Sequence, residues 1–200
     1  MYVIGRLFPR FMACSILVSL LAACGVNDIP TYDEAVKATW AQVDNQYKRR
    51  ADLIPNLVEV VKGFAAQEQE TLTAVVEARA KATQMQIPSD ILSNPQAFQA
   101  FEANQGALTQ ALSRLLLVVE RYPDLKSNQN FLNLQAQLEG TENRIAVARR
   151  DYIQAVQVYN TELRTFPGRI WAALLYSDMD LRETFSQPES LAEPPEVKFN

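Results

Sequence analysis

The residue best placed for covalent chemistry is Cys24. It follows Leu21-Ala22-Ala23 at the end of an apolar run, 11–23, that comes after a short basic start. Small residues before a cysteine at this position are typical of a bacterial signal peptide that is cut in front of the cysteine, which then carries palmitate-type acyl chains. The run is shorter than the about 20 apolar residues that a membrane-spanning helix needs. We therefore predict a signal peptide at 1–23 and a lipid anchor on Cys24.

The alternative is an uncleaved signal anchor, in which Tyr2, Val3, Ile4 and Leu7 extend the apolar stretch. In both cases we expect the rest of the chain to be held at a membrane of the cell envelope, facing the periplasm or the exterior. Residue 25 is glycine rather than aspartate, which permits export to the outer membrane in a bacterium with two membranes.

The composition excludes most catalytic and metal-binding chemistry. The chain has no histidine, and Cys14, the poorer candidate for lipidation, would leave with the signal peptide. Neither a histidine acid/base nor a His/Cys metal site then remains. The six glycines form no dinucleotide-binding or P-loop pattern. We expect no cofactor, no metal and no enzymatic activity.

The charge argues against a nucleic-acid partner. The net charge is −4, and it becomes −6 when Arg6 and Arg10 are removed with the signal peptide. Nucleic-acid-binding domains carry a basic patch instead. An acidic body is mildly repelled by anionic lipid, so membrane attachment should depend on the lipid anchor rather than on basic residues.

Two groups of polar residues remain as candidates for a binding site. The first lies around Pro55 and comprises Arg49, Arg50, Asp52, Asn56 and Glu59. The second comprises Glu142, Asn143, Arg144, Arg149, Arg150 and Asn160. Antiparallel packing would bring the groups together, either as ion pairs that fix the register of the helices, which we favour, or as a cleft that binds an anionic ligand through arginine.

Two pairs of acidic residues, Asp52 with Glu59 and Glu139 with Glu142, deserve comparison with catalytic carboxylates. Glu139 and Glu142 are three residues apart and share one face of a helix. Solvated acidic pairs are common on helix surfaces, so neither pair predicts hydrolysis or metal binding.

Long helices must position these residues. Apolar residues spaced by three and four predict helices at 32–85, 95–122 and 128–166, and no strand pattern competes. Pro55 interrupts the first helix, where we expect a kink or a break near Asp52. Short connections then predict an all-α fold, an antiparallel up-and-down bundle of three long helices plus a shorter fourth segment. The predicted domains are a signal peptide (1–23), a lipidated N-terminus and tether (24–31), the bundle (32–185) and a proline-rich extended tail (186–200).

The fourth segment, 170–185, is predicted to be a short helix or an ordered apolar stretch. It contains Trp171, Leu174, Leu175 and Tyr176. If exposed, these residues would mark a partner or membrane surface. We favour packing, because the preceding helices offer apolar ends.

Several blocks of residues on these helices resemble the LemA family. They are Arg49-Arg50-Ala51-Asp52-Leu53-Ile54-Pro55-Asn56-Leu57-Val58-Glu59, Val61-Lys62-Gly63-Phe64-Ala65, Tyr122-Pro123-Asp124-Leu125-Lys126 with Asn130-Phe131, Leu134-Gln135, Thr141-Glu142-Asn143-Arg144-Ile145-Ala146, Ala148-Arg149-Arg150, Val158-Tyr159-Asn160-Thr161 and Phe166-Pro167. The blocks span 32–185 in the family's order. The resemblance implies an all-α bundle that is attached to a membrane at its N-terminus and faces away from the cytoplasm.

The resemblance implies no reaction, since the family has no catalytic motif to carry over. In typical members of the family the N-terminal segment resembles an uncleaved transmembrane helix. In this chain Cys24 indicates a lipid anchor instead. We therefore expect a non-catalytic structural or interaction protein of the envelope that binds an unidentified envelope protein. The alternative is a ligand-binding or enzyme-like bundle with an Arg/Asp/Glu cleft. Membrane remodelling through the helix faces is least favoured, because the first helix mixes acidic and basic residues.

Overall fold

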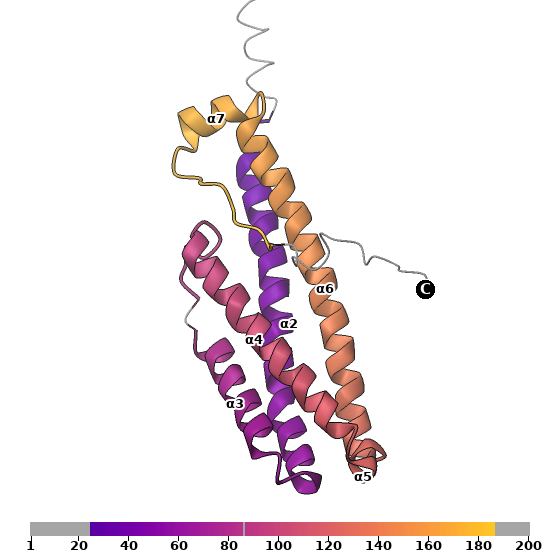
Figure 1. The fold of residues 1–200 in the computed structure, drawn as a ribbon. Helices are drawn as coiled ribbons and strands as arrows, with labels where there is room; N and C mark the ends of the chain where they lie inside the picture. The colour runs from indigo at the N-terminus through magenta and orange to yellow at the C-terminus, as the bar shows by residue number, and fades with distance from the viewer. Residues whose placement is uncertain (1–24, 86, 187–200) are drawn as a thin grey trace, which may run out of the picture. The chain divides into compact units, whose positions relative to one another are not determined.

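A computed structural model describes residues 25–85 and 87–186 as helices joined by turns (Figure 1). The predicted signal peptide, Cys24 and nearly all of the predicted tail lie outside these residues. No strand occurs in the described ranges, which confirms the all-α prediction. None of the helices found there is both long and apolar enough to cross a bilayer. The helices are α2 (Asp28–Phe64), α3 (Gln69–Gln84), α4 (Pro95–Val119), α5 (Pro123–Lys126), α6 (Gln129–Arg164) and α7 (Gly168–Leu175).

The chain divides into two compact units, to which α2 and α6 both contribute. Unit 1 contains the chain up to Ala38 together with Gln154–Arg182. Unit 2 contains Thr39–Ile153 and the residues from Glu183 onward. The sequence pattern predicted one bundle at 32–185 and gave no sign of this division.

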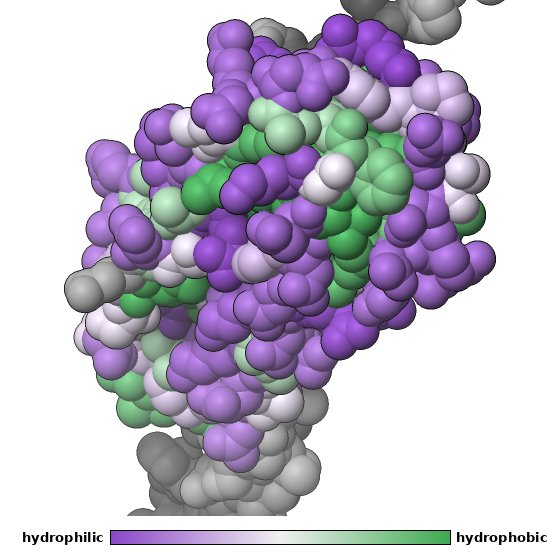
Figure 2. Space-filling view, turned by 90° about the horizontal axis from the view of Figure 1, so that it is seen from below, coloured by the Kyte–Doolittle hydropathy of each residue, from purple (hydrophilic) through white to green (hydrophobic). Residues whose placement is uncertain are grey.

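The core of unit 2 is built from apolar residues that recur at helical spacing. Ile54 and Leu57 of α2, Leu108 and Leu115 of α4, and Leu125 of α5 are at most 2% exposed. They pack with Leu72 and Val75 of α3 and with Phe131 and Leu138 of α6. Outward-facing positions are mostly polar, so the face seen in Figure 2 is largely hydrophilic, with hydrophobic residues between polar ones.

The helix predicted at 32–85 is two helices, and the break is not at Pro55. α2 continues through Pro55 and ends at Phe64. A proline lacks the N–H that would bond to the carbonyl four residues earlier, here that of Ala51. Nε of Arg79, on α3, donates a hydrogen bond of 2.8 Å to this carbonyl oxygen. The unpaired backbone acceptor is thereby satisfied, and the helix tolerates the proline.

The break itself lies between Phe64 and Gln69, and side chains from outside α2 and α3 stabilise it. Glu68 accepts hydrogen bonds from the guanidinium of Arg121 at 2.9 Å and from the hydroxyl of Tyr122 at 2.7 Å. Gln67 donates to the same hydroxyl at 2.9 Å. Side chains beyond the end of α4 therefore fix the turn that connects α2 to α3.

The other helices differ from their predicted bounds mainly at the ends. α2 begins at Asp28, so residues 28–31 are helical rather than a tether. Asn94 caps α4 by accepting a hydrogen bond from the Ala97 N–H at 3.1 Å. Oδ1 of Asn128 accepts from the Phe131 N–H at the start of α6, also at 3.1 Å. In the segment predicted at 170–185 the helix ends at Leu175, and 176–186 is irregular.

An ion pair and several tyrosine and asparagine contacts hold unit 1 together. Oδ1 of Asp33, in α2, accepts hydrogen bonds from Nε and Nη2 of Arg182 at 3.0 and 2.6 Å. Asn160 of α6 bonds to both the backbone N–H and the carbonyl of Arg182 at 2.9 Å. The hydroxyl of Tyr159 donates to the Asp180 carbonyl at 3.1 Å. Asn160, a predicted site residue, therefore anchors the irregular segment that follows α7.

Gly168 allows the chain to turn closely after α6. A Cβ at this position would collide with the backbone oxygen and the carboxylate of Glu162. Only glycine avoids this contact. The chain can therefore end α6 at Arg164 and start α7 at Gly168, directly after Pro167.

The Asp33 carboxylate should make unit 1 sensitive to acid. Burial raises its pKa, but hydrogen bonds and charges from Lys37 and Arg182 outweigh this effect and leave the pKa below its usual 3.8. A carboxylate with a lowered folded-state pKa stabilises the fold above the unfolded-state pKa, and this contribution is lost as the pH falls through the folded-state value. Asp33→Asn should cost about 2 kcal/mol at pH 7 and less at pH 3, which lies below the unfolded-state pKa.

Urea unfolding of both proteins at pH 7 and pH 3 checks this prediction. The matched control is Asp44→Asn, which removes an exposed pair with Lys48 on the same helix and should cost less than about 0.5 kcal/mol at either pH. An equal loss for Asp33→Asn at both pH values would contradict the assigned ion pair.

Candidate functional site

Arg50 is the centre of the polar cluster that the sequence predicted. Its side chain is 1% exposed although it carries a charge. Nη1 donates to Thr109 Oγ1 at 3.0 Å and to Glu142 Oε1 at 3.1 Å. Nη2 donates to Gln105 Oε1 at 2.6 Å and to the Gln105 carbonyl at 3.3 Å. Packing therefore brings residues of the two predicted polar groups, Arg50 and Glu142, into one ion pair.

The helix register explains why this arginine lies inside. Arg50 follows Val43 and Tyr47 at spacings of four and three on the buried face of α2, whereas Arg49 falls on the exposed face. The guanidinium also lies 4.9 Å from the centre of the Tyr47 ring, a favourable distance for a cation–π contact. Burial raises the pKa of the Tyr47 phenol, against the lowering effect of Arg149 and Arg50.

A second ion pair lies beside the first. Nη2 of Arg149 is 3.3 Å from Oε1 of Glu102 on α4. The same guanidinium lies 4.2 Å from the centre of the Phe185 ring, and Ser186 donates to Oε2 of Glu102 at 2.7 Å. Glu102, Phe185 and Ser186 were not among the sequence candidates, since nothing in the local pattern indicated that the irregular segment returns to α4.

Several of these residues line one open groove between α4 and α6. The groove has a volume of about 860 Å³. Three arginines and two glutamates border it: Arg50, Arg149, Arg150, Glu102 and Glu142. Arg50 is paired with Glu142 and Arg149 with Glu102, while Arg150 is exposed and lies 3.5 Å from Asp151. The groove is therefore a surface of mutually compensating charges.

The structure separates the remaining candidates from this cluster. All are exposed on the outer faces of α2 and α6: Arg49, Asp52, Asn56, Glu59, Asn143 and Arg144. Asn56 and Glu59 border a shallow hollow of about 420 Å³ with Asn130 and Gln137. Nη2 of Arg144 donates a hydrogen bond of 3.4 Å to Oγ1 of Thr141 on the same helix. Arg50, Glu142 and Arg149 form ion pairs, as the favoured prediction expects. The exposed residues do not take part in these pairs.

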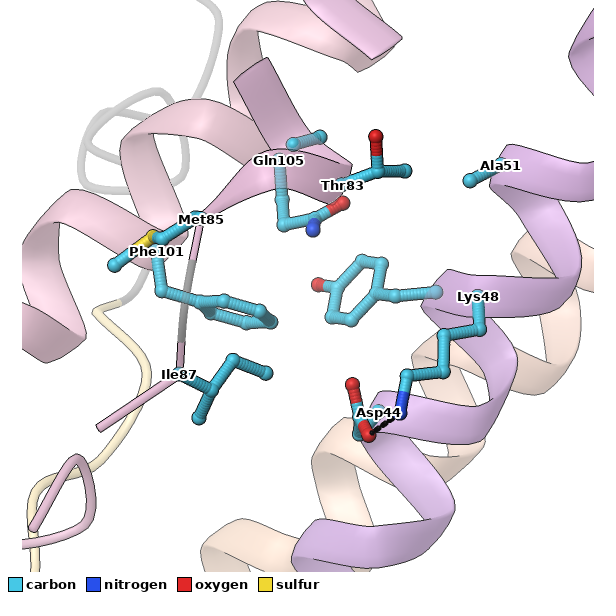
Figure 3. A pocket seen from close by; sticks show the side chains of 10 residues that line it. Asp44, Lys48, Ala51, Thr83, Met85, Ile87, Phe101 and Gln105 are labelled. Atoms are coloured by element: carbon cyan, nitrogen blue, oxygen red, sulfur yellow. Dashed lines mark hydrogen bonds and ion pairs between the residues drawn. The ribbon is translucent and has the colours of Figure 1, made fainter. Parts of the chain in front are cut away.

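A smaller pocket lies on the other side of Tyr47, between α2, α3 and α4 (Figure 3). Its volume is about 290 Å³ and most of its lining is apolar, including Met85, Ile87 and Phe101. Its charged residues, Asp44 and Lys48, pair with each other at 2.6 Å. In the described part of the chain no three acidic, cysteine or histidine side chains gather as a metal site would require.

Comparison with known proteins identifies the family of this chain. The LemA family profile matches residues 39–199. The magnetosome proteins MamQ 1 and MamQ 2 of Paramagnetospirillum magneticum (strain AMB-1) are each 25% identical over 185 residues, which is 84% of this chain and 67% of theirs. Protein LemA of Metamycoplasma hominis is 24% identical over 134 residues, 67% of this chain and 55% of that protein. None of these names states a reaction. The chain therefore belongs to the LemA family.

Proposed function

We propose that this protein is a membrane-anchored lipoprotein of the bacterial cell envelope that acts without catalysis, as a helical scaffold for another envelope protein. The observation that carries the proposal is the position of Cys24 directly after Leu21-Ala22-Ala23 at the end of the apolar run. Cleavage there would leave the cysteine as the first residue, only four positions before α2 begins. Unit 1 would then start almost at the membrane surface.

The arrangement of the polar residues supports a non-catalytic role. A catalytic or anion-binding arginine needs free hydrogen-bond donors directed at the ligand. Both terminal nitrogens of Arg50 are instead engaged by Gln105, Thr109 and Glu142. An anionic ligand that bound Arg50 or Arg149 would have to displace Glu142 or Glu102 from an existing pair. The groove is better suited to hold α4 and α6 in register than to bind a phosphate or carboxylate.

The relatives are compatible with this proposal. Two of them are named magnetosome proteins and one is named protein LemA. These names state no reaction, and we extend no further property from them to the present chain.

Substitution of Cys24 tests the proposal in the producing bacterium. Cys24→Ser should abolish acylation and signal cleavage, and the protein should no longer incorporate labelled palmitate. The matched control is Cys14→Ser, which changes the other cysteine of the predicted signal peptide and should be processed and labelled normally. Chemical cross-linking of wild-type membranes should then yield a discrete adduct with another envelope protein, identified by mass spectrometry.

Two outcomes would overturn the proposal. Equal labelling of Cys24→Ser and wild type would exclude the lipid anchor. Failure to recover any adduct, combined with saturable binding of an anionic small molecule that Arg149→Met removes, would favour the ligand-binding alternative.

A further inference from the structure

The helix α7 presents an apolar stripe to solvent. Ile170 and Leu174 are four residues apart on α7, Leu175 is adjacent to the latter, and Phe166 lies two residues before the helix begins. In this order, their exposed fractions are 44%, 70%, 59% and 78%. We call these four residues the α7 stripe. The packing expected for this segment from its sequence is therefore wrong for Leu174 and Leu175, because the helix turns away after Gly168 and leaves one face uncovered within unit 1.

The stripe lies next to the point where the described chain begins. A Cβ placed on Gly25 would be 3.6 Å from Cγ of Pro167, the residue between Phe166 and Gly168. Figure 1 shows α7 at the same end of unit 1 as the start of α2. Gly25 directly follows Cys24 in the sequence. A membrane anchor at Cys24 would therefore also bring the α7 stripe close to that membrane.

The composition of α7 suits the boundary between lipid headgroups and acyl chains. The helix Gly168–Leu175 contains no acidic residue, and Arg169 is its one charge. Trp171 lies within it, and tryptophan is enriched at this boundary. Short amphipathic helices with aromatic and leucine residues on one face bind there by burying that face about 5–10 Å deep. Contiguous exposed apolar residues mark sites that contact a protein or a membrane.

We propose that the α7 stripe inserts into the surface of the membrane that carries the Cys24 anchor, as a second contact that fixes the orientation of unit 1. This inference rests on the proposed anchoring, because the anchor places Gly25 at the membrane. It holds equally if residues 1–23 are retained as a signal anchor. The α7 stripe contacts the lipid surface, rather than a partner protein or a second copy of the chain.

Tryptophan fluorescence tests the insertion directly, because the chain contains only Trp40 and Trp171. The full-length protein is expressed in bacteria, purified from membranes and reconstituted into vesicles of phosphatidylethanolamine and phosphatidylglycerol, with or without lipid brominated near the headgroup. In a Trp40→Phe background, brominated lipid should reduce Trp171 emission about twofold. The matched control is Trp171→Phe, in which the buried Trp40 should not be quenched. Leu174→Glu with Leu175→Glu should return the quenching of Trp171 to the level of this control.

The same samples separate this inference from the proposed anchoring. Flotation of the vesicles reports attachment, and fluorescence reports insertion of α7. Protein that floats while Trp171 is unquenched would overturn the α7 inference and leave the anchor intact. Protein that fails to float would contradict the anchoring. An unquenched Trp171, together with a cross-linked dimer that Leu174→Glu with Leu175→Glu abolishes, would assign the stripe to a second copy of the chain.

Discussion

Replacing Arg50 by methionine should lower the free energy of unfolding by about 3 kcal/mol, because buried partners lose their donor. Methionine retains most of the apolar stem, so the loss reports the guanidinium rather than the packing. Gln105 loses two hydrogen bonds, one to its side chain and one to its carbonyl, and Glu142 loses its ion pair. Urea unfolding followed by circular dichroism measures the change.

Two features set the size of this effect. Glu142 is 39% exposed at its side chain, so water partly replaces the lost charge and the cost stays below that of a fully buried pair. Nε of Arg50 is buried and has no hydrogen-bond partner among the described residues, which also reduces the net contribution of the arginine. We therefore expect a value at the lower end of the range of about 3–5 kcal/mol for broken buried pairs.

The neighbouring Arg49 provides the matched control. Its side chain is exposed, so Arg49→Met should change stability by less than about 0.5 kcal/mol. Equal stabilities of the two variants would contradict the described cluster. A gain in stability for Arg50→Met would indicate an arginine retained for ligand binding at the expense of stability, and would support the cleft interpretation.

Trp40→Ala should lower the free energy of unfolding by about 4 kcal/mol, as expected for removal of a large buried aromatic residue. Trp40 is 9% exposed. Its ring centre lies 5.7 Å from that of Phe98, 5.1 Å from Phe101, 5.4 Å from Tyr152 and 6.3 Å from Phe185. These residues come from α4, α6 and the irregular segment, so one ring joins several elements of unit 2.

The near-ultraviolet circular dichroism of this variant should also weaken, because the aromatic cluster loses its central ring. The control is Phe166→Ala, which removes an aromatic side chain that is 78% exposed and should cost less than about 0.5 kcal/mol in detergent solution. A loss for Trp40→Ala no larger than that of the control would contradict the placement of Trp40 in the core.

The sequence predicted the helices better than it predicted their ends. Periodicity located α4 and α6 closely, because their apolar faces are long and their ends carry Asn94-Pro95 and Pro167-Gly168. The break after Phe64 was missed, because hydrogen bonds from Arg121 and Tyr122, far along the chain, hold that turn. Pro55 was misleading for a similar reason, since Arg79 satisfies the carbonyl that the proline leaves unpaired.

The candidate site was predictable only in part. Arg50 and Glu142 are paired as the favoured interpretation required, but the adjacent Arg49 points outward, because neighbouring helical positions face different directions. Glu102 and Phe185 were missed, since their roles depend on how the irregular segment folds back. The exposure of the α7 stripe followed from the close turn at Gly168, which no local pattern specifies.

The measurement that tests the central claim most directly is the intact mass of the protein purified from its native membranes. We predict a chain that lacks residues 1–23 and carries added mass equal to acyl groups on Cys24, whereas Cys24→Ser should retain its full length. A full-length, unmodified wild-type chain in the membrane fraction would contradict the lipoprotein assignment and identify the N-terminal segment as an uncleaved anchor.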